Sequence, residues 1–368
     1  MDFDRKYIQI SLYLLKKIIG TTFPNPPVVS LIVEFDKNLK EDKIVSFGIT
    51  GFGGRPHAEA TALKNMKYRK NKIYTLYSTL EPCCHEGRDE SCVLKILKGK
   101  IQRVVYSLRD PDFRVDGGGA KLLTKNGVEV LGNLMDAESK KIYSGYIMNR
   151  KLKRPKVIIK MACSLDGKIA LKKNKRTRIT NQSVKKIVHI IRSEVDAILV
   201  GSNTVIVDNP LLNCRIKGFE SFSPYRIVLS QKLSFDINSH IFKNCLKYPT
   251  IVFTIDSNKR KIEELSSKKV KIIILEKKEF NLKNIMYKLA KLGICNLLVE
   301  GGSKIFTSFL NENLYDEVMI FRSSGFIGST GQSAISNLNL SRVKKKLTLK
   351  QIYQIEDNSL EVLEVKRD

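Results

Sequence analysis

The sequence has no tryptophan, only four histidines, and few acidic residues, with 37 Asp and Glu against 65 Lys and Arg. No apolar run approaches the roughly 20 residues that a membrane-spanning helix needs, so we expect no integral membrane protein. Short-period repeats and low-complexity tracts are also missing from the 368 residues, of which 42% are hydrophobic. This composition excludes a disordered chain. At about 150 residues per domain, the length of the chain predicts two or three globular domains.

The formal net charge of +28 is the main departure from an ordinary composition. A polyanionic partner, such as nucleic acid or an acidic membrane, is one explanation. The lysines are scattered along the chain rather than gathered in blocks, however, and no tryptophan is present. The pattern therefore favours a lysine-rich surface that suits small phosphorylated substrates, with no membrane partner.

The odd number of cysteines argues against a framework of disulfides. The first twenty residues combine charges with an amphipathic pattern, which predicts a surface helix rather than a signal peptide. We therefore expect a cytoplasmic protein, in which clustered cysteines indicate metal binding or catalysis. The seven cysteines are Cys83, Cys84, Cys92, Cys163, Cys214, Cys245 and Cys295.

Alternating strand and helix patterns predict an α/β fold in both halves of the chain. A basic, proline-ended segment at 149–155 predicts a linker, and we place the domains at 1–150 and 151–368. In the first half we expect strands at 28–33, 73–80, 103–108 and 128–130, and helices at 8–19, 57–63, 92–97 and 137–146. In the second half we expect strands at 157–161, 197–200, 226–229, 250–253, 271–275 and 297–299, helices at 182–193 and 285–292, and a hairpin at 347–365.

The strongest chemical pattern is a His-x-Glu pair, His57 and Glu59, followed by Cys83 after a proline and then by Cys92. A catalytic zinc ion takes nitrogen and sulfur ligands from three side chains and leaves a fourth position for water. His57, Cys83 and Cys92 supply such a set. Glu59 can lie beside the metal, take a proton from the water and deliver it to a leaving amine. The pattern matches the signature of zinc deaminases, so we predict one Zn²⁺ ion here.

A closed structural zinc site that also uses Cys84 is the alternative to this catalytic site. Two adjacent thiols are poorly placed to share one tetrahedral ion, so we expect Cys84 to point away from the metal. We interpret His85 as a loop residue rather than a ligand.

The segment from Thr79 to Arg88, Thr-Leu-Glu-Pro-Cys-Cys-His-Glu-Gly-Arg, together with Cys92, resembles the bifunctional riboflavin-biosynthesis deaminase–reductase family. Eight residues separate the two cysteines of the site, a longer insert than the two residues of many zinc deaminases. Phe-Pro-Asn-Pro at 23–26 resembles the family's His-Pro-Asn-Pro, which implies that Asn25 contacts the pyrimidine. Asp-Pro-Asp at 110–112 resembles an Asp-Pro-Asn turn. The resemblance implies a cytidine-deaminase-like, three-layer α/β/α domain.

The second half contains segments that resemble the family's reductase domain, at 160–168, 197–215 and 299–303. The last of these is a Val-Glu-Gly-Gly-Ser loop, and such a loop between a strand and a helix can hold a phosphate on its backbone N–H groups. The resemblance implies a dihydrofolate-reductase-like α/β domain that binds NADPH. The implied substrate contacts are Arg192, Leu212, Arg215 and Glu300; the implied cofactor contacts are Ala162, Arg178, Thr204, Asp208, Gly301, Gly302, Ser303, Lys304, Ile305, Phe306 and Thr307.

In the second half, two positions depart from the family pattern. Its Trp-Ile-Thr segment reads Arg-Ile-Thr from Arg178, and a serine that contacts the substrate is replaced by Arg176. The basic loop at 172–178 either holds the 2′-phosphate of NADPH or is simply solvated. These departures leave open the alternative of a zinc deaminase whose second domain is inactive.

The resemblance implies two reactions on one small molecule. The first removes the 2-amino group of a diaminopyrimidinone ribosylamine 5′-phosphate with zinc, and the second reduces the ribosyl group to a ribityl chain with NADPH. A basic protein that binds or edits nucleic acid is the remaining alternative. A homo-oligomer is compatible with these patterns, which do not specify an oligomeric state.

Overall fold

Residues 2–36, 41–85, 87 and 89–366 are described by a computed structural model, in which one compact unit ends at Lys153 and another begins at Arg154. The helices of the first unit are α1 (Asp2–Leu15), α2 (Ala58–Asn65), α3 (Cys92–Lys98), α4 (Gly118–Lys125), α5 (Asp136–Ile142) and α6 (Ser144–Leu152). Its strands are β1 (Val29–Asp36), β2 (Glu41–Ile49), β3 (Ile73–Leu80), β4 (Arg103–Leu108) and β5 (Glu129–Leu131).

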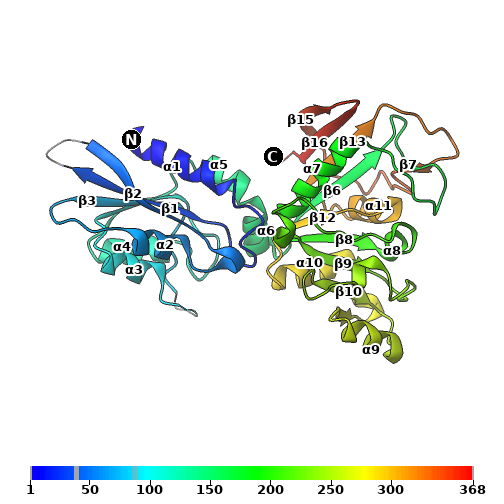
Figure 1. The fold of residues 1–368 in the computed structure, drawn as a ribbon, viewed down its shortest axis with the longest axis horizontal. Coiled ribbons are helices and arrows are strands. Elements are labelled where there is room, and N and C mark those ends of the chain that lie inside the picture. Colours follow the sequence, from blue (N-terminus) through cyan, green and yellow to red (C-terminus); the bar gives the residue numbers. More distant parts are fainter. Residues whose placement is uncertain (1, 37–40, 86, 88, 367–368) are drawn as a thin grey trace. The chain divides into compact units, whose positions relative to one another are not determined.

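The first unit is a sheet covered by helices on both faces, with the strand order β2-β1-β3-β4-β5. Strands β3, β4 and β5 run parallel, and β1 is antiparallel to both of its neighbours. Figure 1 shows α1 and α5 on one face and α2, α3 and α4 on the other. Ile32, Leu76 and Val104 project from the strands into a buried cluster with Ala62 of α2 and Val93 of α3. This packing brings the N-terminal ends of α2 and α3 close to the end of β3.

The second unit contains a larger sheet with the order β11-β10-β9-β8-β12-β6-β13-β16-β15. Its strands are β6 (Lys156–Cys163), β8 (Ala197–Gly201), β9 (Tyr225–Leu229), β10 (Thr250–Thr254), β11 (Lys271–Ile274), β12 (Asn296–Val299), β13 (Glu317–Ser323), β15 (Leu347–Ile355) and β16 (Asn358–Val365), with a separate pair formed by β7 (Lys168–Ala170) and β14 (Gln332–Ser333). From β11 to β13 neighbouring strands are parallel, and the hairpin β15–β16 adds an antiparallel edge.

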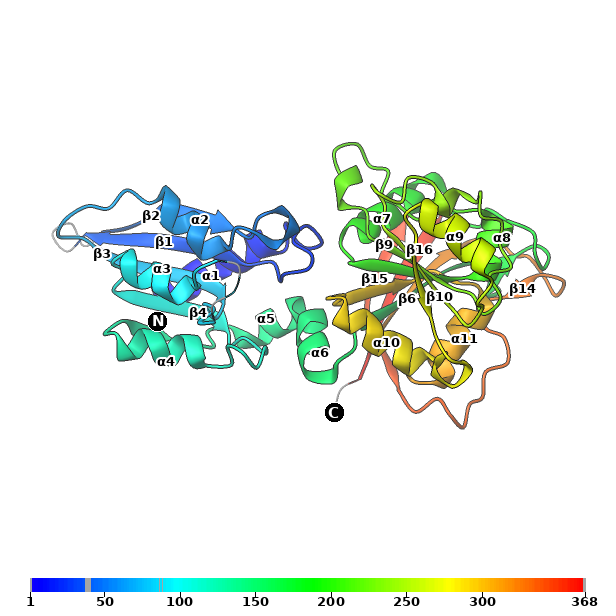
Figure 2. The same ribbon diagram turned by 90° about the horizontal axis from the view of Figure 1, so that it is seen from below.

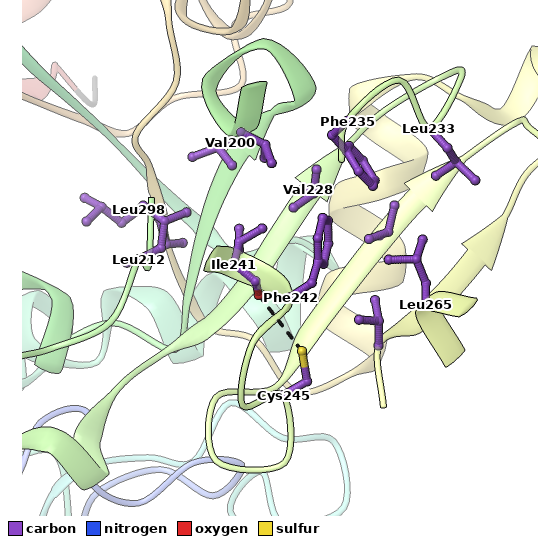
Figure 3. Close-up of a cluster of buried hydrophobic side chains, with 14 of the residues drawn as sticks. Val200, Leu212, Val228, Leu233, Phe235, Ile241, Phe242, Cys245, Leu265 and Leu298 are labelled. Atoms are coloured by element: carbon purple, nitrogen blue, oxygen red, sulfur yellow. Dashed lines mark hydrogen bonds between the residues drawn. The ribbon is translucent and has the colours of Figure 1, made fainter. Parts of the chain in front are cut away.

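The helices of the second unit are α7 (Gln182–Ser193), α8 (Ser202–Asp208), α9 (Lys259–Ser267), α10 (Leu282–Lys291) and α11 (Ser303–Asn311). Figure 2 shows α10 and α11 on one face of the sheet and α7, α8 and α9 on the other. One core cluster of this unit lies between the sheet and the segments that connect its strands. Figure 3 shows Val200 and Val228 of the strands in that core, with Leu212, Ile241 and Phe242 from the connecting segments.

Most predicted strands and helices are present, and several boundaries need correction. The first helix ends at Leu15 rather than 19, and the helix predicted at 137–146 is two helices, α5 and α6. The predicted linker at 149–155 is wrong at its start, because α6 continues to Leu152 with Met148 and Asn149 buried on its inner side. The strand expected at 128–130 lies one residue later. The sequence patterns missed β2, β7, β13, β14, α4, α8 and α9.

The missed elements carry weak periodic signals. Strand β2 is at the edge of its sheet and leaves most of its residues partly or fully exposed. Helix α9 is polar along most of its length and buries only Leu265. Hydrophobic periodicity reports burial, so an element with little burial gives little pattern. Within the described ranges, no helix has both the length and the apolarity needed to cross a bilayer.

Candidate active sites

The first site lies where three elements of the first unit meet. His57 is the residue that precedes α2, Cys83 follows β3, and Cys92 is the first residue of α3. The Nδ1 atom of His57 lies 3.3 Å from the Sγ of Cys92 and 3.6 Å from the Sγ of Cys83. One donor atom from each residue lies within 4.8 Å of the others. The fold therefore brings one imidazole and two thiols to a single point.

This donor set fits zinc. Bonds of about 2.0–2.3 Å in a tetrahedral site hold neighbouring ligand atoms roughly 3.3–3.8 Å apart, close to the two measured separations. Hydrogen bonding from Cys92 and His57 lowers the pKa of Cys83 to about 4, against the effect of burial. The thiolate is the form of cysteine that binds metal. Cys84 points elsewhere, because its thiol lies 3.6 Å from the carbonyl oxygen of Arg114.

Glu59 lies in the first turn of α2 and is buried, with 4% of its surface exposed. One of its carboxylate oxygens, Oε2, is 3.4 Å from the Sγ of Cys92. Burial raises the pKa of this carboxyl group, and the neighbouring Cys83 adds to the rise. A carboxyl group with a raised pKa can both take and release a proton near neutral pH. The geometry therefore provides a proton carrier beside the candidate metal ligands.

A pocket of about 210 Å³ opens beside these residues and is lined by His57, Glu59 and Cys83 together with Asn25. The side-chain amide of Asn25 donates a hydrogen bond to the carbonyl oxygen of Gly54 at 2.8 Å, which holds it at the pocket. A methyl group on Gly54 would lie 2.7 Å from the Cβ of Asn25, so only glycine allows this close approach. The predicted substrate contact therefore shares a pocket with two of the predicted ligands, His57 and Cys83.

Further residues of this pocket were not predicted to contact the substrate. His85 lines it, and its buried Nδ1 has no hydrogen-bond partner among the described residues. Tyr146 donates a hydrogen bond to Asp110 at 3.0 Å, and both line the pocket. The only sequence signal for His85 was its place in the Cys-Cys-His segment. Glu86 and Arg88 of the same segment lie outside the described residues.

Glu81, the acid of the Thr-Leu-Glu-Pro-Cys segment, lines this pocket and holds the neighbouring chain in place. Its buried carboxylate accepts hydrogen bonds from the backbone N–H groups of Asp110, Gly117 and Ala120 at 3.0–3.2 Å. A carboxylate that satisfies three amides fixes the path of the chain there. The segment 110–120, which includes the Asp-Pro-Asp turn, is thereby held against the end of β3.

The second site is a pocket of about 500 Å³ in the second unit. It is formed by the ends of β6 and β12, the helix α7, and the segments that follow α8 and β7. The predicted contacts that line it are Ala162, Arg178, Arg192, Thr204, Asp208, Leu212, Arg215, Glu300, Gly301, Gly302 and Phe306. The pocket-lining residues do not include Ser303, Lys304, Ile305 or Thr307, although α11 begins directly at its edge.

Three of these four residues have contacts elsewhere. The hydroxyl of Thr307 accepts a hydrogen bond from the backbone N–H of Ser336, and that of Ser303 accepts one from Gln332. The side chain of Ile305 packs at Gly301, where a methyl group would lie 2.6 Å from its Cβ. Gly301 is therefore required for close packing of the loop on α11.

A buried charge cluster lies on the floor of the second pocket. Arg192 donates two hydrogen bonds to Glu300, both at 2.8 Å, and Lys160 lies 3.9 Å from the same carboxylate. Burial opposes ionisation of Glu300, but Arg192 and Lys160 hold its pKa at about 2. Lys160, which sequence patterns did not identify, has its own pKa lowered by burial. The predicted substrate contacts Arg192 and Glu300 thus bind each other in this structure.

Replacing Glu300 by glutamine is expected to destabilise the second unit by about 3–5 kcal/mol, because two buried cations lose their carboxylate. Pulse proteolysis in urea, with the surviving fragments separated by size, measures this loss for the second unit by itself. The control is Glu361→Gln, which breaks a similar bidentate pair with Arg322 whose side chains are about a quarter exposed. That change is expected to cost under about 1 kcal/mol. Equal losses in the two variants would contradict the prediction.

Two family models match the chain. The model of the cytidine and deoxycytidylate deaminase zinc-binding region matches residues 1–108, and the model of the RibD C-terminal domain matches residues 155–360. Among curated relatives, the riboflavin biosynthesis protein RibD of Aquifex aeolicus is 38% identical over 349 residues, which cover 94% of this chain and 95% of that protein. RibD of Actinobacillus pleuropneumoniae is 31% identical over 350 residues.

Solved structures show the same likeness over the full length of the chain. Acinetobacter baumannii RibD superposes with a TM-score of 0.87 at 24% identity and covers 99% of both chains, a likeness of fold. A Thermotoga maritima protein described as a diaminohydroxyphosphoribosylaminopyrimidine deaminase/5-amino-6-(5-phosphoribosylamino)uracil reductase superposes with a TM-score of 0.83 at 29% identity, again over 99% of both chains. The predicted fold class, a deaminase-like α/β/α domain followed by a reductase-like α/β domain, is confirmed.

Proposed function

This chain belongs to the family of the riboflavin biosynthesis protein RibD, and we propose that His57, Cys83 and Cys92 bind the zinc ion of its deaminase while Glu59 carries the proton. The chain is a bifunctional deaminase and reductase of riboflavin biosynthesis that uses zinc and NADPH. The observation that supports the assignment of these residues is the convergence of three donor atoms beside a buried carboxylate, with His57, Cys83 and Glu59 lining one pocket.

We propose that the deaminase substrate is a 2,5-diaminopyrimidinone ribosylamine 5′-phosphate, the kind of compound on which the Thermotoga maritima relative acts. Zinc, when bound, lowers the pKa of its water and so supplies a nucleophile at neutral pH. The carboxylate of Glu59 would take the proton that the water loses as its oxygen bonds to the ring carbon, and would deliver that proton to the 2-amino group as the C–N bond breaks and ammonia leaves. Asn25 and His85 line the same pocket and orient the pyrimidine ring by hydrogen bonds.

For the reductase, we propose that the second pocket holds NADPH beside the ribosyl group of the deaminated product. The cofactor contributes the hydride, and the protein aligns the two reacting groups. Ala162, Thr204 and Asp208 are assigned to the cofactor; Leu212 and Arg215 are assigned to the sugar phosphate. Arg176 and Arg178 also line the pocket and add positive charge for a phosphate group.

The proposed function is tested with the zinc-loaded full-length protein. Given the diaminopyrimidinone phosphate, it is expected to release ammonia, and with NADPH added it is expected to oxidise one NADPH per ammonia released. Ammonia release without NADPH oxidation, even when the deaminated intermediate is supplied, would favour the alternative of an inactive second unit. Metal analysis of the same sample measures the zinc content.

We propose a small-molecule substrate and a cytoplasmic location for the enzyme. A pocket of about 210 Å³ beside the candidate ligands suits a single pyrimidine. The candidate ligands Cys83 and Cys92 are free thiols, which suits a reducing compartment. Tight, salt-sensitive binding of RNA or DNA to the purified protein would instead support the nucleic-acid alternative.

A further inference from the structure

The segment Asp208–Leu212 forms one wall of the reductase pocket, and its residues alternate in what they contact. Asp208, Pro210 and Leu212 line the pocket. Asn209 and Leu211, the residues between them, are bound by groups that do not line it. We call this five-residue stretch the pocket segment.

His240 and Arg226 bind the intervening residues of the pocket segment. The backbone N–H of His240 donates to the Oδ1 of Asn209 at 2.7 Å, and the ring Nδ1 of His240 lies 3.0 Å from the carbonyl oxygen of Asn209. The Nη1 of Arg226 donates to the carbonyl oxygen of Leu211 at 3.3 Å. Neither His240 nor Arg226 is among the described residues that line the pocket. The pocket segment is therefore held at Asn209 and Leu211, its two residues that do not line the pocket.

The pocket segment needs such support, because two of its residues have left-handed backbone conformations. The φ angles are 42° at Asn209 and 49° at Leu212. Asparagine tolerates this region, but leucine rarely adopts it. Leu212 is nevertheless buried, and its side chain packs into the core with Ile241 and Phe242 (Figure 3). A conformation of this kind persists only when its surroundings hold it.

Arg226 is an unusual residue for the interior of a sheet. It lies in β9 with 0% of its surface exposed. Its partners in the described part of the chain are the carbonyl oxygens of Leu211, Lys243 and Tyr248 and the thiol of Cys245, with no carboxylate among them. Burying a cation without a carboxylate is costly, so the residue is a poor choice for stability alone. Through these hydrogen bonds, Arg226 joins the pocket segment to the segment 240–248.

We propose that Arg226 and His240 are positioning residues of the reductase, which hold the pocket segment in the shape that binds NADPH and the sugar phosphate. They act through Asn209 and Leu211 and touch neither ligand. The inference rests on the proposed roles of Asp208 and Leu212 in this pocket. According to this inference, the buried Arg226 and the exposed His240 affect how tightly the reductase pocket binds its ligands.

His240→Ala is the first test, because His240 is exposed and its removal leaves the core intact. The KM for NADPH and the KM for the deaminated pyrimidine are expected to rise about threefold to tenfold, the effect of losing one hydrogen bond, while kcat stays within about twofold. Ammonia release by the other unit is expected to stay unchanged. Unchanged KM values in the folded variant would overturn the role of His240.

Arg226→Met and Arg226→Lys form the second test, with Arg260→Met as the matched control on the exposed face of α9. Methionine is expected to raise both KM values more than His240→Ala does, and lysine, which keeps a cationic donor, is expected to restore part of the loss. The control is expected to match the parent enzyme. If Arg226→Met lowers the thermal midpoint and leaves both KM values unchanged, Arg226 is purely structural and the inference fails.

Asp208→Ala separates this inference from the proposed pocket itself. If Asp208→Ala leaves the KM for NADPH unchanged, the assignment of the cofactor to this wall is wrong. If Asp208→Ala raises that KM and the Arg226 and His240 variants do not, the pocket assignment stands and only the positioning role is rejected.

Discussion

Replacing Glu59 by glutamine is expected to slow ammonia release roughly 10³-fold, within the range of about 10²–10⁴ that a general acid–base group contributes. Glutamine keeps the size of the side chain but cannot take a proton from water or return it to the leaving amine. Glu59 is buried beside the candidate ligands, and its Oε2 approaches the thiol of Cys92 at 3.4 Å.

Zinc content is expected to stay at one ion per chain in Glu59→Gln, since the proposed donor set is His57, Cys83 and Cys92. NADPH oxidation with the deaminated intermediate is also expected to stay unchanged. Glu138→Gln, on the exposed surface of α5, is the matched control and should behave as the parent protein. A Glu59→Gln enzyme that releases ammonia at the parental rate would remove Glu59 from the proton path.

Replacing Cys92 by serine is expected to weaken zinc binding by more than about 100-fold, because neighbours that merely orient a ligand already contribute about 10–100-fold. The serine hydroxyl does not ionise near neutral pH, so the site loses one of its two thiolates. Metal analysis after dialysis against a chelator measures the zinc content. Ammonia release is expected to fall in parallel, and NADPH oxidation by the second unit is expected to persist.

Cys84→Ser is the matched control for this experiment. Its thiol lies near the carbonyl oxygen of Arg114 and is not part of the cluster formed by the other three residues. Full zinc content is therefore expected in Cys84→Ser. If Cys84→Ser loses zinc while Cys92→Ser keeps its full zinc content, Cys84 rather than Cys92 is the ligand and the assignment is overturned.

The candidate zinc site could be predicted from the sequence because its chemistry needs particular atoms at short spacing. His57 and Glu59 are two residues apart at the start of α2, Cys83 follows β3, and Cys92 begins α3. The reductase site was reached mainly through resemblance. Its Gly-Gly loop was placed correctly at a strand–helix junction, but only part of the stretch from Gly301 to Thr307 faces the pocket.

The sequence could not predict contacts between residues that are far apart along the chain. Arg192 and Glu300 are 108 positions apart, and Glu81 binds amides 29 to 39 positions away. Such pairs depend on the order of strands in the sheet, and hydrophobic periodicity carries no information about that order. Arg226 illustrates the limit, because a lone arginine in an apolar strand predicts neither its burial nor its carbonyl partners.

The sequence by itself determined the two α/β halves, the zinc-type donor set with its adjacent acid, and the family to which they belong. These follow from local patterns and from the kinds of atom that each reaction needs. Only the tertiary structure decided that His85 lines the first pocket and that Arg192 and Glu300 bind each other. It also decided that Arg226 and His240 hold the segment Asp208–Leu212. Those features arise from packing, in which each buried polar group must find a partner wherever the fold brings one within reach.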